Sequence, residues 1–335
     1  MGLVLMSVLA FLVLAVMSAP KDESPSGETL ISQARSREVW AEGTPAVRMR
    51  GLIEVSGANR TVAQGDYAVD WVSPSQWREE IRFANYQRMR IRDAKGYWQK
   101  ASLDYQPYLI CLLTDLLDLK TVLSVSSKET LGKVRTRQKD GIQQRCVDLN
   151  IAKRTNRVLC FDDKSAAFLA IEYPQGEYEN PPDLSRIEYK DFHSVAGKLI
   201  PYDRRGLKDG KTVASVKIAE VNELNPIKDA EFTPPPSAEL WPQCDGMLEA
   251  DLTGRVVPNY PESARRNREM GRVILYGVVE ADGTSSHLMV IKGASPALSE
   301  AAMEAFRHSH YTLAQCQGTP IRLETFFATD FQLRQ

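Results

Sequence analysis

The C-terminal region, residues 252–335, constrains the fold most, because three local patterns follow one another there. Asp282-Gly283 lies between two apolar runs, and this dipeptide favours a two-residue hairpin turn because glycine accepts a positive φ. Ser295-Pro296 suits a helix N-cap and a first-turn proline, and apolar residues then recur at helical spacing. From Ile321 onward apolar and polar residues alternate, as in a strand with one buried face. We therefore predict a small α+β module in which one helix covers a three-stranded antiparallel sheet that keeps one exposed edge.

Several short motifs in this region occur in a fixed order. They are Pro258-x-Tyr260-Pro261-x-x-Ala264-Arg265, Gly271-x-Val273, Asp282-Gly283, an alanine-rich helix, Gly318-x-Pro320 and a last strand ending Phe331-x-Leu333. With these motifs, residues 252–333 resemble the C-terminal domain of TonB, the periplasmic energy transducer that reaches from the inner membrane to outer-membrane receptors. The segment from His308 to Ala314 departs from that family, which usually carries an aromatic-Pro-Ala sequence there, so the connection from helix to last strand stays open.

The TonB resemblance implies a binding edge, because in that family the last strand pairs with an extended peptide of the receptor. The residues that it assigns to partner binding are Ile321, Arg322, Leu323, Glu324, Thr325, Phe326 and Phe327, together with Pro258 and Tyr260. Backbone hydrogen bonds would supply the affinity, and the same open edge would allow two copies to pair as a homodimer. The alternative is an edge covered by the upstream domain or blunted by Arg322, Glu324 and Asp330.

Composition narrows the class of protein. The chain has 335 residues, of which 43% are hydrophobic and 25% charged, which suits two globular domains. The net charge is −1, so no overall field attracts nucleic acid or anionic lipid. We therefore expect no nucleic-acid partner.

The amino terminus predicts export. Residues 3–19 are apolar and uncharged, and the polar residues 20–28 that follow are expected to be flexible. The apolar run lies between the length of a leader core and that of a membrane span, so a cleaved signal peptide and an inner-membrane signal anchor both stay open. Either places the protein in the periplasm of a Gram-negative-type bacterium, soluble or anchored through residues 3–19.

The five cysteines agree with an oxidising compartment. Folding the chain about Lys153 brings Cys146 and Cys160 to opposed positions of a hairpin, which predicts a disulfide. Cys244 and Cys316 are then left to pair within the C-terminal module, and Cys111 is expected to be a buried free thiol. The alternative for the second pair is zinc bound with His308 and His310, but no Cys-x-x-Cys spacing supports it, and we predict no metal.

Residues 29–232 read as a separate β-rich domain, followed by a proline-rich linker at 233–251. Helices are predicted at 29–41 and 108–119. Strands are predicted at 47–56, 64–72, 77–83, 87–93, 97–100, on both sides of the cysteine hairpin, and at 167–173, 185–192, 198–204 and 212–221. Tight turns between successive strands favour a long antiparallel sheet that curls into a half-barrel around the helices.

A second resemblance lies in this domain. Pro74 is followed three residues later by Trp77, and Asp93 is followed by Gly96 and Trp98, a pattern similar to the LolA and LolB group of periplasmic lipoprotein carriers. That resemblance implies a concave apolar face that holds acyl chains, with Trp71, Trp77 and Trp98 as lipid-binding residues; each buried CH₂ would contribute about 0.8 kcal/mol. The alternative is that these tryptophans, with Tyr97 and Tyr105, fill a closed core.

Nothing in the sequence points to catalysis. The four histidines, at 193, 287, 308 and 310, belong to no catalytic or metal-binding motif, and no phosphate-binding loop is present. We therefore predict no enzyme and no cofactor.

Two functions follow from these patterns. The first is a noncatalytic envelope protein of the TonB family that binds an extended peptide of an outer-membrane receptor or another envelope protein, in TonB-dependent transmembrane transport. Binding is favoured over force transmission, because the longest proline run is only Pro234-Pro235-Pro236 and residues 3–19 contain no histidine. The alternative is a periplasmic carrier of lipid or acylated protein that uses the half-barrel.

Overall fold

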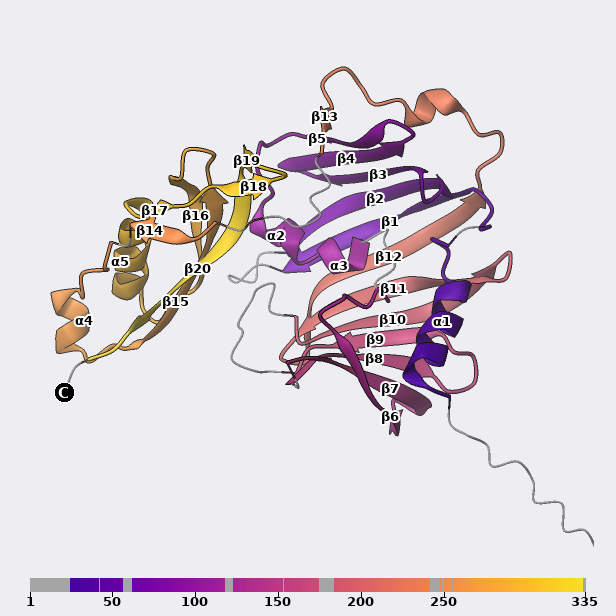
Figure 1. The fold of residues 1–335 in the computed structure, drawn as a ribbon, viewed down its shortest axis with the longest axis horizontal. Helices are drawn as coiled ribbons and strands as arrows, with labels where there is room; N and C mark the ends of the chain where they lie inside the picture. The colour runs from indigo at the N-terminus through magenta and orange to yellow at the C-terminus, as the bar shows by residue number, and fades with distance from the viewer. Residues whose placement is uncertain are drawn as a thin grey trace, which may run out of the picture.

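A computed structural model describes residues 25–41, 43–56, 62–117, 123–152, 154–174, 184–241, 248, 250–254 and 256–333 (Figure 1). The predicted leader at 1–19 lies outside these residues. The first described helix, α1 (Gly27–Arg37), begins where Ser26 accepts a hydrogen bond from the backbone N–H of Thr29. None of the helices in the described ranges has the length and apolar character needed to cross a membrane.

A 13-stranded antiparallel sheet forms the larger part of the molecule, and it resembles two meanders joined side by side. Its order is β13-β5-β4-β3-β2-β1-β12-β11-β10-β9-β8-β7-β6, so β1 and β12, far apart in the sequence, pair at the join. The bounds of the first meander are β1 (Val47–Ser56), β2 (Val62–Ser73), β3 (Gln76–Phe83), β4 (Tyr86–Asp93) and β5 (Gly96–Ala101). Those of the second are β6 (Thr130–Lys139), β7 (Ile142–Ile151), β8 (Arg154–Asp162), β9 (Phe168–Glu172), β10 (Arg186–Val195), β11 (Lys198–Lys208) and β12 (Lys211–Glu223).

The core lies on the concave side of this sheet. Inward-facing residues of the strands, such as Met49, Trp71 and Ile81, are fully buried against α1 and the segment after β5. Figure 1 shows the sheet curling around α1, α2 and α3. The helix predicted at 108–119 is instead two short helices, α2 (Tyr108–Cys111) and α3 (Thr114–Leu117). At the break, the Thr114 hydroxyl donates to the carbonyl of Ile110 at 3.4 Å and competes with the helical backbone pattern.

The predicted linker also contributes to the sheet. After the 3₁₀ helix η1 (Asp229–Phe232), β13 (Glu239–Leu240) pairs with β5 and extends the sheet by one short strand. The edge of β5 offers unpaired backbone groups, and a segment held nearby by η1 can satisfy two of its residues. Part of 233–251 is therefore sheet rather than a spacer.

The C-terminal module has the predicted α+β architecture. Its central sheet has the order β16-β15-β20 and is covered on one face by α5. The bounds of its elements are β14 (Leu252–Gly254), α4 (Glu262–Arg266), β15 (Gly271–Val279), β16 (Ser285–Lys292), α5 (Pro296–Arg307), β17 (His310–Tyr311), β18 (Ala314–Cys316), β19 (Thr319–Ile321) and β20 (Leu323–Phe331). The connection after α5, whose structure the sequence left undetermined, forms β17, and β17 pairs with β14.

The turn between β15 and β16 differs from the prediction. The N–H of Gly283 donates to the carbonyl of Glu280 at 3.0 Å, and the N–H of Glu280 donates to the carbonyl of Thr284 at 2.8 Å. The loop is therefore a three-residue turn closed by Gly283 at φ 80°, and the expected two-residue turn was wrong. Asp282 has another role, because its carboxylate accepts a hydrogen bond from the N–H of Thr284 at 2.9 Å.

Candidate partner-binding edge

Strand β20 presents a regular sheet edge. It pairs with β15 in nine consecutive residue pairs, from Gly271 with Phe331 to Val279 with Leu323, without a register shift. Within the described ranges of the chain, no strand pairs with the other side of β20. Alternate N–H and C=O groups along that side therefore form a continuous template for another strand.

Strand β16, the other outer strand of the same sheet, presents an irregular edge. Its pairing with β15 shifts register twice, near Ile274 and near Tyr276. His287 in β16 adopts a left-handed backbone conformation with φ 50°. Bulges of this kind twist an edge away from further pairing. Of the two outer strands, β20 thus has the more regular edge.

The structure places the sequence-predicted edge residues on two strands. Those from Leu323 to Phe327 lie on β20, whereas Ile321 pairs with Ala314 in the β18–β19 hairpin. Arg322 lies between the two strands. Tyr260 contacts Phe331 with ring centroids 5.6 Å apart, so it lies at the far end of β20 from Ile321, and Pro258 lies two residues before it. The predicted single strand from Ile321 is therefore broken at Arg322.

The two faces of β20 have different neighbours. Phe327 faces α5, and its ring lies 5.3 Å from those of Phe306 and Tyr311. Phe326 points to the opposite face of the sheet, where its ring lies 6.2 Å from that of Tyr108 in helix α2. The upstream segment thus covers one face of the module beside β20, and none of the described upstream strands pairs with the edge of β20.

Charged side chains near the start of β20 are already bound. Arg322 donates to the Asp104 carboxylate at 2.9 Å and to Glu280 at 3.0 Å. The hydrogen bond that the Asp104 carboxylate accepts from Arg322 holds the pKa of Asp104 below its ordinary value. Glu324 accepts from the backbone N–H of Gln106 at 3.0 Å. Arg322 and Glu324, which could have protected the edge, therefore bind the upstream segment instead. Asp330, at the other end of β20, is exposed.

Sequence reasoning missed Tyr276, Tyr108 and Gln106 as contact residues between the two parts. One signal could have found Tyr276. The sequence of β15 is apolar at almost every position, and Tyr276 and Val278 point away from α5. A strand that is apolar on both faces needs a cover on each.

The three predicted lipid-binding tryptophans do not form one site. Trp71 is 1% exposed and lies edge-to-face with Trp40, with ring centroids 5.2 Å apart. Trp77 packs against Tyr97 at 5.5 Å on the same concave side. Trp98 lies on the opposite face of β5 from Tyr97, and its indole N–H donates to Asp93 at 3.0 Å. Trp71 and Trp77 belong to the packed core, and Trp98 does not.

A cavity on the concave side is small. It lies between α1, α3 and β10–β11, next to Phe168 and Tyr189, and has a volume of about 60 Å³. Ligand pockets commonly have volumes of about 300–1,000 Å³. An acyl chain would therefore require the helices to move away from the sheet.

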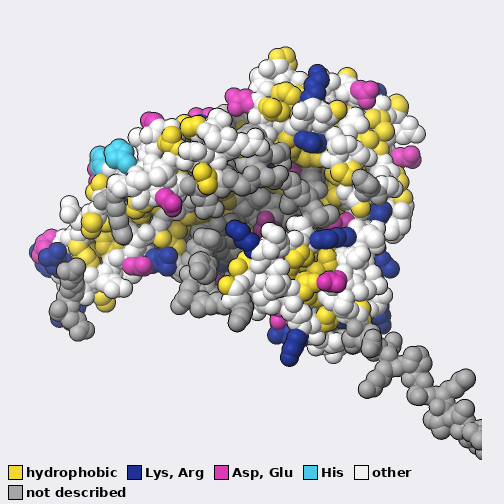
Figure 2. Space-filling model, viewed as in Figure 1, with side chains coloured by type: hydrophobic (Ala, Val, Ile, Leu, Met, Phe, Trp, Pro, Cys, Tyr) yellow, Lys and Arg dark blue, Asp and Glu magenta, His cyan; other side chains and the backbone are white. Residues whose placement is uncertain are grey.

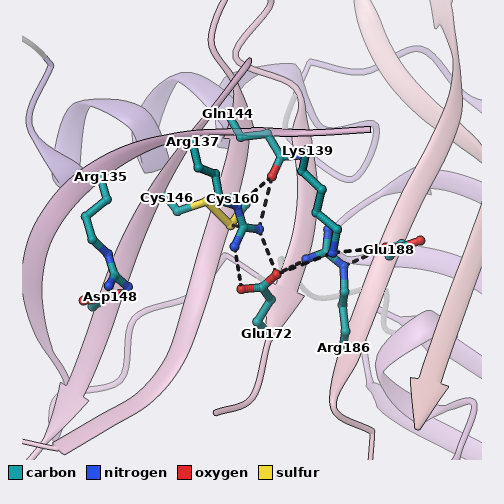
Figure 3. Close-up of a disulfide and its surroundings, with 10 residues drawn as sticks. All are labelled: Arg135, Arg137, Lys139, Gln144, Cys146, Asp148, Cys160, Glu172, Arg186 and Glu188. Carbon is teal, nitrogen blue, oxygen red and sulfur yellow. Dashed lines mark hydrogen bonds and ion pairs between the residues drawn. A yellow bond between two sulfur atoms is a disulfide. The ribbon is translucent and has the colours of Figure 1, made fainter. Parts of the chain in front are cut away.

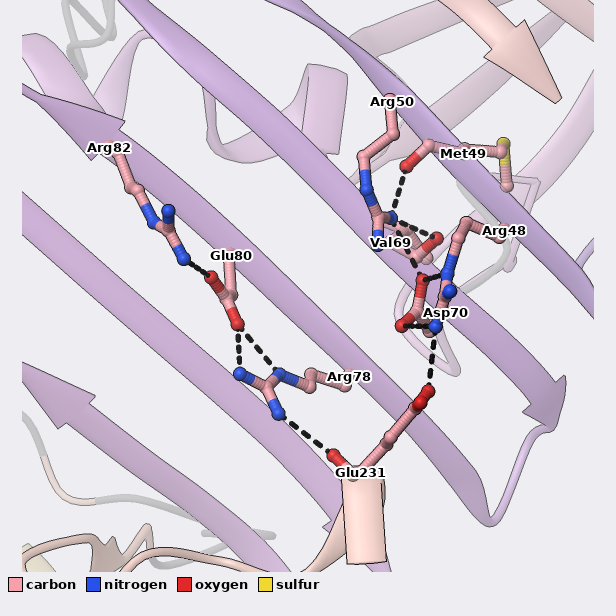
Figure 4. Close-up of polar contacts among 9 residues, drawn as sticks. All are labelled: Arg48, Met49, Arg50, Val69, Asp70, Arg78, Glu80, Arg82 and Glu231. Atoms are coloured by element: carbon pink, nitrogen blue, oxygen red, sulfur yellow. Dashed lines mark hydrogen bonds and ion pairs between the residues drawn. The ribbon is translucent and has the colours of Figure 1, made fainter. Parts of the chain in front are cut away.

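A larger groove of about 480 Å³ lies on the convex face of β1–β3 (Figure 4). The charged residues that line it are Arg48, Arg50, Arg78, Arg82, Asp66, Asp70, Glu80 and Glu231. Four arginines thus face four carboxylates, and their formal charges cancel. The groove offers no net charge to an anion or a cation.

One buried carboxylate, that of Asp70, organises this groove. Asp70 accepts from Arg48 at 2.9 and 2.8 Å and from Arg50 at 2.8 Å, as Figure 4 shows. Burial would raise the pKa of Asp70, but these hydrogen bonds hold it below its ordinary value. Arg48 also binds Glu231 of η1 at 2.6 Å. The network therefore fixes η1 and the chain after it to the large sheet.

The predicted hairpin disulfide is present. Cys146 and Cys160 are directly opposed on β7 and β8 and form a disulfide with their Cα atoms 4.1 Å apart. Figure 3 shows Arg137 beside it, where the guanidinium donates to Glu172 at 2.7 Å. The neighbouring ion pairs include Arg186 and Lys139. The disulfide thus lies beside a network of ion pairs on the outer face of the sheet.

The other described cysteines, Cys316 and Cys111, differ in their bonding. Cys316 is disulfide-bonded, and its predicted partner Cys244 lies outside the described residues. Cys111 is a free thiol and is half-buried. Among the residues that the structure describes, no three His, Cys, Asp or Glu side chains are grouped to hold a metal ion. His308, weighed above as a ligand, instead hydrogen-bonds Glu304 at 2.8 Å.

Comparison with known proteins gives a family for the module. Residues 256–333 match the family model described as Gram-negative bacterial TonB protein C-terminal. No curated protein sequence matches the chain. The module therefore has the features of a TonB C-terminal domain, which indicates a TonB-family function in the cell envelope.

Solved structures are similar to the large sheet. One is a putative outer membrane lipoprotein-sorting protein domain from Vibrio parahaemolyticus, at 10% identity and TM-score 0.43, covering 60% of this chain and 95% of that one. Another is a LolA superfamily protein from Nitrosomonas europaea, at 11% identity and TM-score 0.41, covering 63% and 99%. MucB is similar at 9% identity and TM-score 0.30, covering 68% and 71%. The family match thus concerns residues 256–333 of the chain.

Proposed function

We propose that this protein is a noncatalytic periplasmic adaptor that binds an extended segment of a partner by strand addition to β20. The observation that carries the proposal is the unshifted nine-residue register of β20 beside an unpaired edge, in contrast to the bulged edge of β16. Each backbone hydrogen bond formed there contributes about 0.5–1.5 kcal/mol net, so several in a row can hold a partner without deep pockets.

The proposed partner is an outer-membrane receptor or another envelope protein in TonB-dependent transport. Residues 1–19 would direct export or anchor the chain in the inner membrane, 29–232 and 252–335 would be the two domains, and 233–251 would join them. Basic and acidic side chains are interspersed on the face seen in Figure 2, so the surface there favours neither sign of charge. Recognition would then depend on backbone pairing and on side chains flanking β20, including Tyr260.

The LolA-like sheet gives the lipid-carrier alternative less support. Trp71 and Trp77 are packed in the core, and the cavity beside α3 has a volume of only about 60 Å³. Lipid that stays bound through mild purification, and is lost when Phe168 at the cavity wall becomes Asp, would reverse this preference.

Selected peptides can test strand addition directly. A displayed library of random 12-residue peptides is selected against the full chain from residue 20, and the tightest binder is synthesised with N-methyl groups on one or the other alternate set of amides. Only alternate residues of an added strand pair with the edge, so one methylated set should lose binding and the other should keep it. Hydrogen exchange should show new protection in β20 and none in β16. Equal binding of both sets, or protection in β16, would contradict the proposal.

A further inference from the structure

The face of the module's sheet opposite α5 is docked on the segment between β5 and α3. Tyr276 is 2% exposed, and its ring lies 5.7 Å from that of Tyr108 in α2. Tyr105 stacks on His287 at 3.9 Å. Phe326 completes the contact, with its ring 5.1 Å from that of Tyr276. Four aromatic rings and an imidazole thus form an apolar contact between the two parts of the chain.

Gln106 is the polar centre of this contact. Its carbonyl accepts from the Tyr276 hydroxyl at 2.5 Å, and its N–H donates to Glu324 at 3.0 Å. Its side-chain oxygen accepts from Arg88 at 2.8 Å, and its side-chain nitrogen donates to the Cys111 sulfur at 3.4 Å. One residue therefore links the buried interior of the large sheet to two strands of the module.

Arg322 holds the same segment just before β20. It donates to the carbonyl of Asp104 at 3.0 Å and to its carboxylate at 2.9 Å. Figure 1 shows the start of β20 next to α2, and its end next to α4 and away from the large sheet. The docked segment therefore flanks only the first half of the strand.

We propose that this docking restricts strand addition to the second half of β20, and that a partner pairing with the whole strand must open the contact. The inference depends on the proposed function. An added strand places side chains about 4.5–5.5 Å from those opposite, alternately on both faces. On the face opposite α5, neighbours of Glu324 and Phe326 would enter space that Gln106 and Tyr108 occupy. Neighbours of Ala328 would not, because that residue is exposed.

Cys111 offers a native readout of docking. Its thiol donates to the Tyr276 hydroxyl at 3.3 Å, and burial raises its pKa, so the reactive thiolate is suppressed while the module is docked. The Tyr276 hydrogen bond alone lowers the pKa of Cys111, but burial outweighs it. Opening the contact exposes the thiol to solvent, which relieves that burial and should accelerate alkylation. Mass mapping of the modified peptide distinguishes Cys111 from every other cysteine.

The experiment uses two probes taken from the peptide selection. One is the full selected peptide, and the other is a truncated form that protects only residues 327–331 of β20 in hydrogen exchange. At saturation the long peptide should raise the Cys111 alkylation rate about tenfold or more, and the short one should leave it unchanged. Since coupling is reciprocal, weakening the docked contact should tighten the long peptide and not the short one.

Tyr105→Ala is the matched variant, because it removes the stack on His287 without touching the core. It should raise both the alkylation rate and the affinity for the long peptide about 2- to 10-fold, the range that an aromatic pair supports. Tyr202→Ala removes another stack, on His193 at 4.0 Å in the large sheet, and should change neither. If the long peptide protects all of β20 while Cys111 alkylation stays unchanged, the coupling is refuted and strand addition stands. If no peptide protects β20, the proposed function fails, and the coupling fails with it.

Discussion

The buried ion pair between Glu79 and Arg88 allows a quantitative prediction about the large sheet. The two side chains are 2% and 1% exposed and lie 3.0 Å apart on β3 and β4. Arg88 also donates to Gln106, so its charge is held by one carboxylate and one amide oxygen. Glu79→Gln keeps an oxygen acceptor but removes the only counter-charge that the structure places within hydrogen-bond distance of Arg88 among the described residues.

The expected cost is about 3–5 kcal/mol, which is typical for removing one partner of a buried pair. Domains are stable by only about 5–15 kcal/mol, so the change should be large in a urea titration. Tryptophan fluorescence is the suitable signal, because all five tryptophans, at 40, 71, 77, 98 and 241, precede the C-terminal module. The transition that it follows therefore reports the large sheet alone.

A double variant tests the physical reason. In Glu79→Leu with Arg88→Met, no unpaired charge remains, so the stability should return to within about 1–2 kcal/mol of the wild type, even with the bond to Gln106 lost. The explanation would be refuted if Glu79→Gln cost less than 1 kcal/mol, or if the double variant were as unstable as the single one.

Three further predictions concern the same sheet. Burial alone would raise the pKa of Glu129, but hydrogen bonds from Arg157 and other donors hold it at about 2. The contribution of Glu129 to stability is therefore present above the unfolded pKa near 4.3 and lost as the pH falls through about 2. Glu129→Gln should cost about 3 kcal/mol at pH 7 and nothing near pH 2, and a constant cost in urea titrations would contradict this. Burial raises the pKa of Asp115, so the stability that the protonated carboxyl allows is lost as the pH rises through the raised value. The melting temperature of Asp115→Asn should therefore rise relative to that of the wild type between pH 4 and pH 7. A relative fall would refute the assignment. Replacing Cys146 and Cys160 by Ser opens a loop of sequence separation 14 and should cost about 3 kcal/mol in the chain-entropy model, with an unchanged tryptophan transition as the contrary result.

Local chemistry in the sequence determined much of this fold. Strand β1 has the predicted bounds, Val47–Ser56, because alternation of apolar and polar residues is a property of each short segment. The β7–β8 hairpin follows from two short strand patterns joined closely in the sequence, and it places both cysteines in register. The helix α5 follows from Ser295 as N-cap and the apolar spacing after it. In each case the deciding interactions lie within a few residues along the chain.

The candidate site was only partly accessible from the sequence. The last strand and its open side follow from alternation and from the family pattern, but the break at Arg322 does not, because it arises where Arg322 reaches Asp104, far away in the sequence. The faces of Trp71 and Trp98 likewise depend on which side of the sheet carries the helices. Alternation indicates that two faces differ, and packing decides which one is inside.

Tertiary structure alone decided how the segments combine. The pairing of β1 with β12, the addition of β13 to β5 and the docking of Tyr276 on Tyr108 each join residues distant in the sequence. Such contacts depend on complementary surfaces that exist only once both partners have folded, and loop closure makes each of them costly until its neighbours are in place. Short-range patterns therefore account for most strands of the large sheet, for α1 and α5, and for the unpaired side of β20 among the described residues, whereas packing between distant segments produced the contact beside the first half of β20.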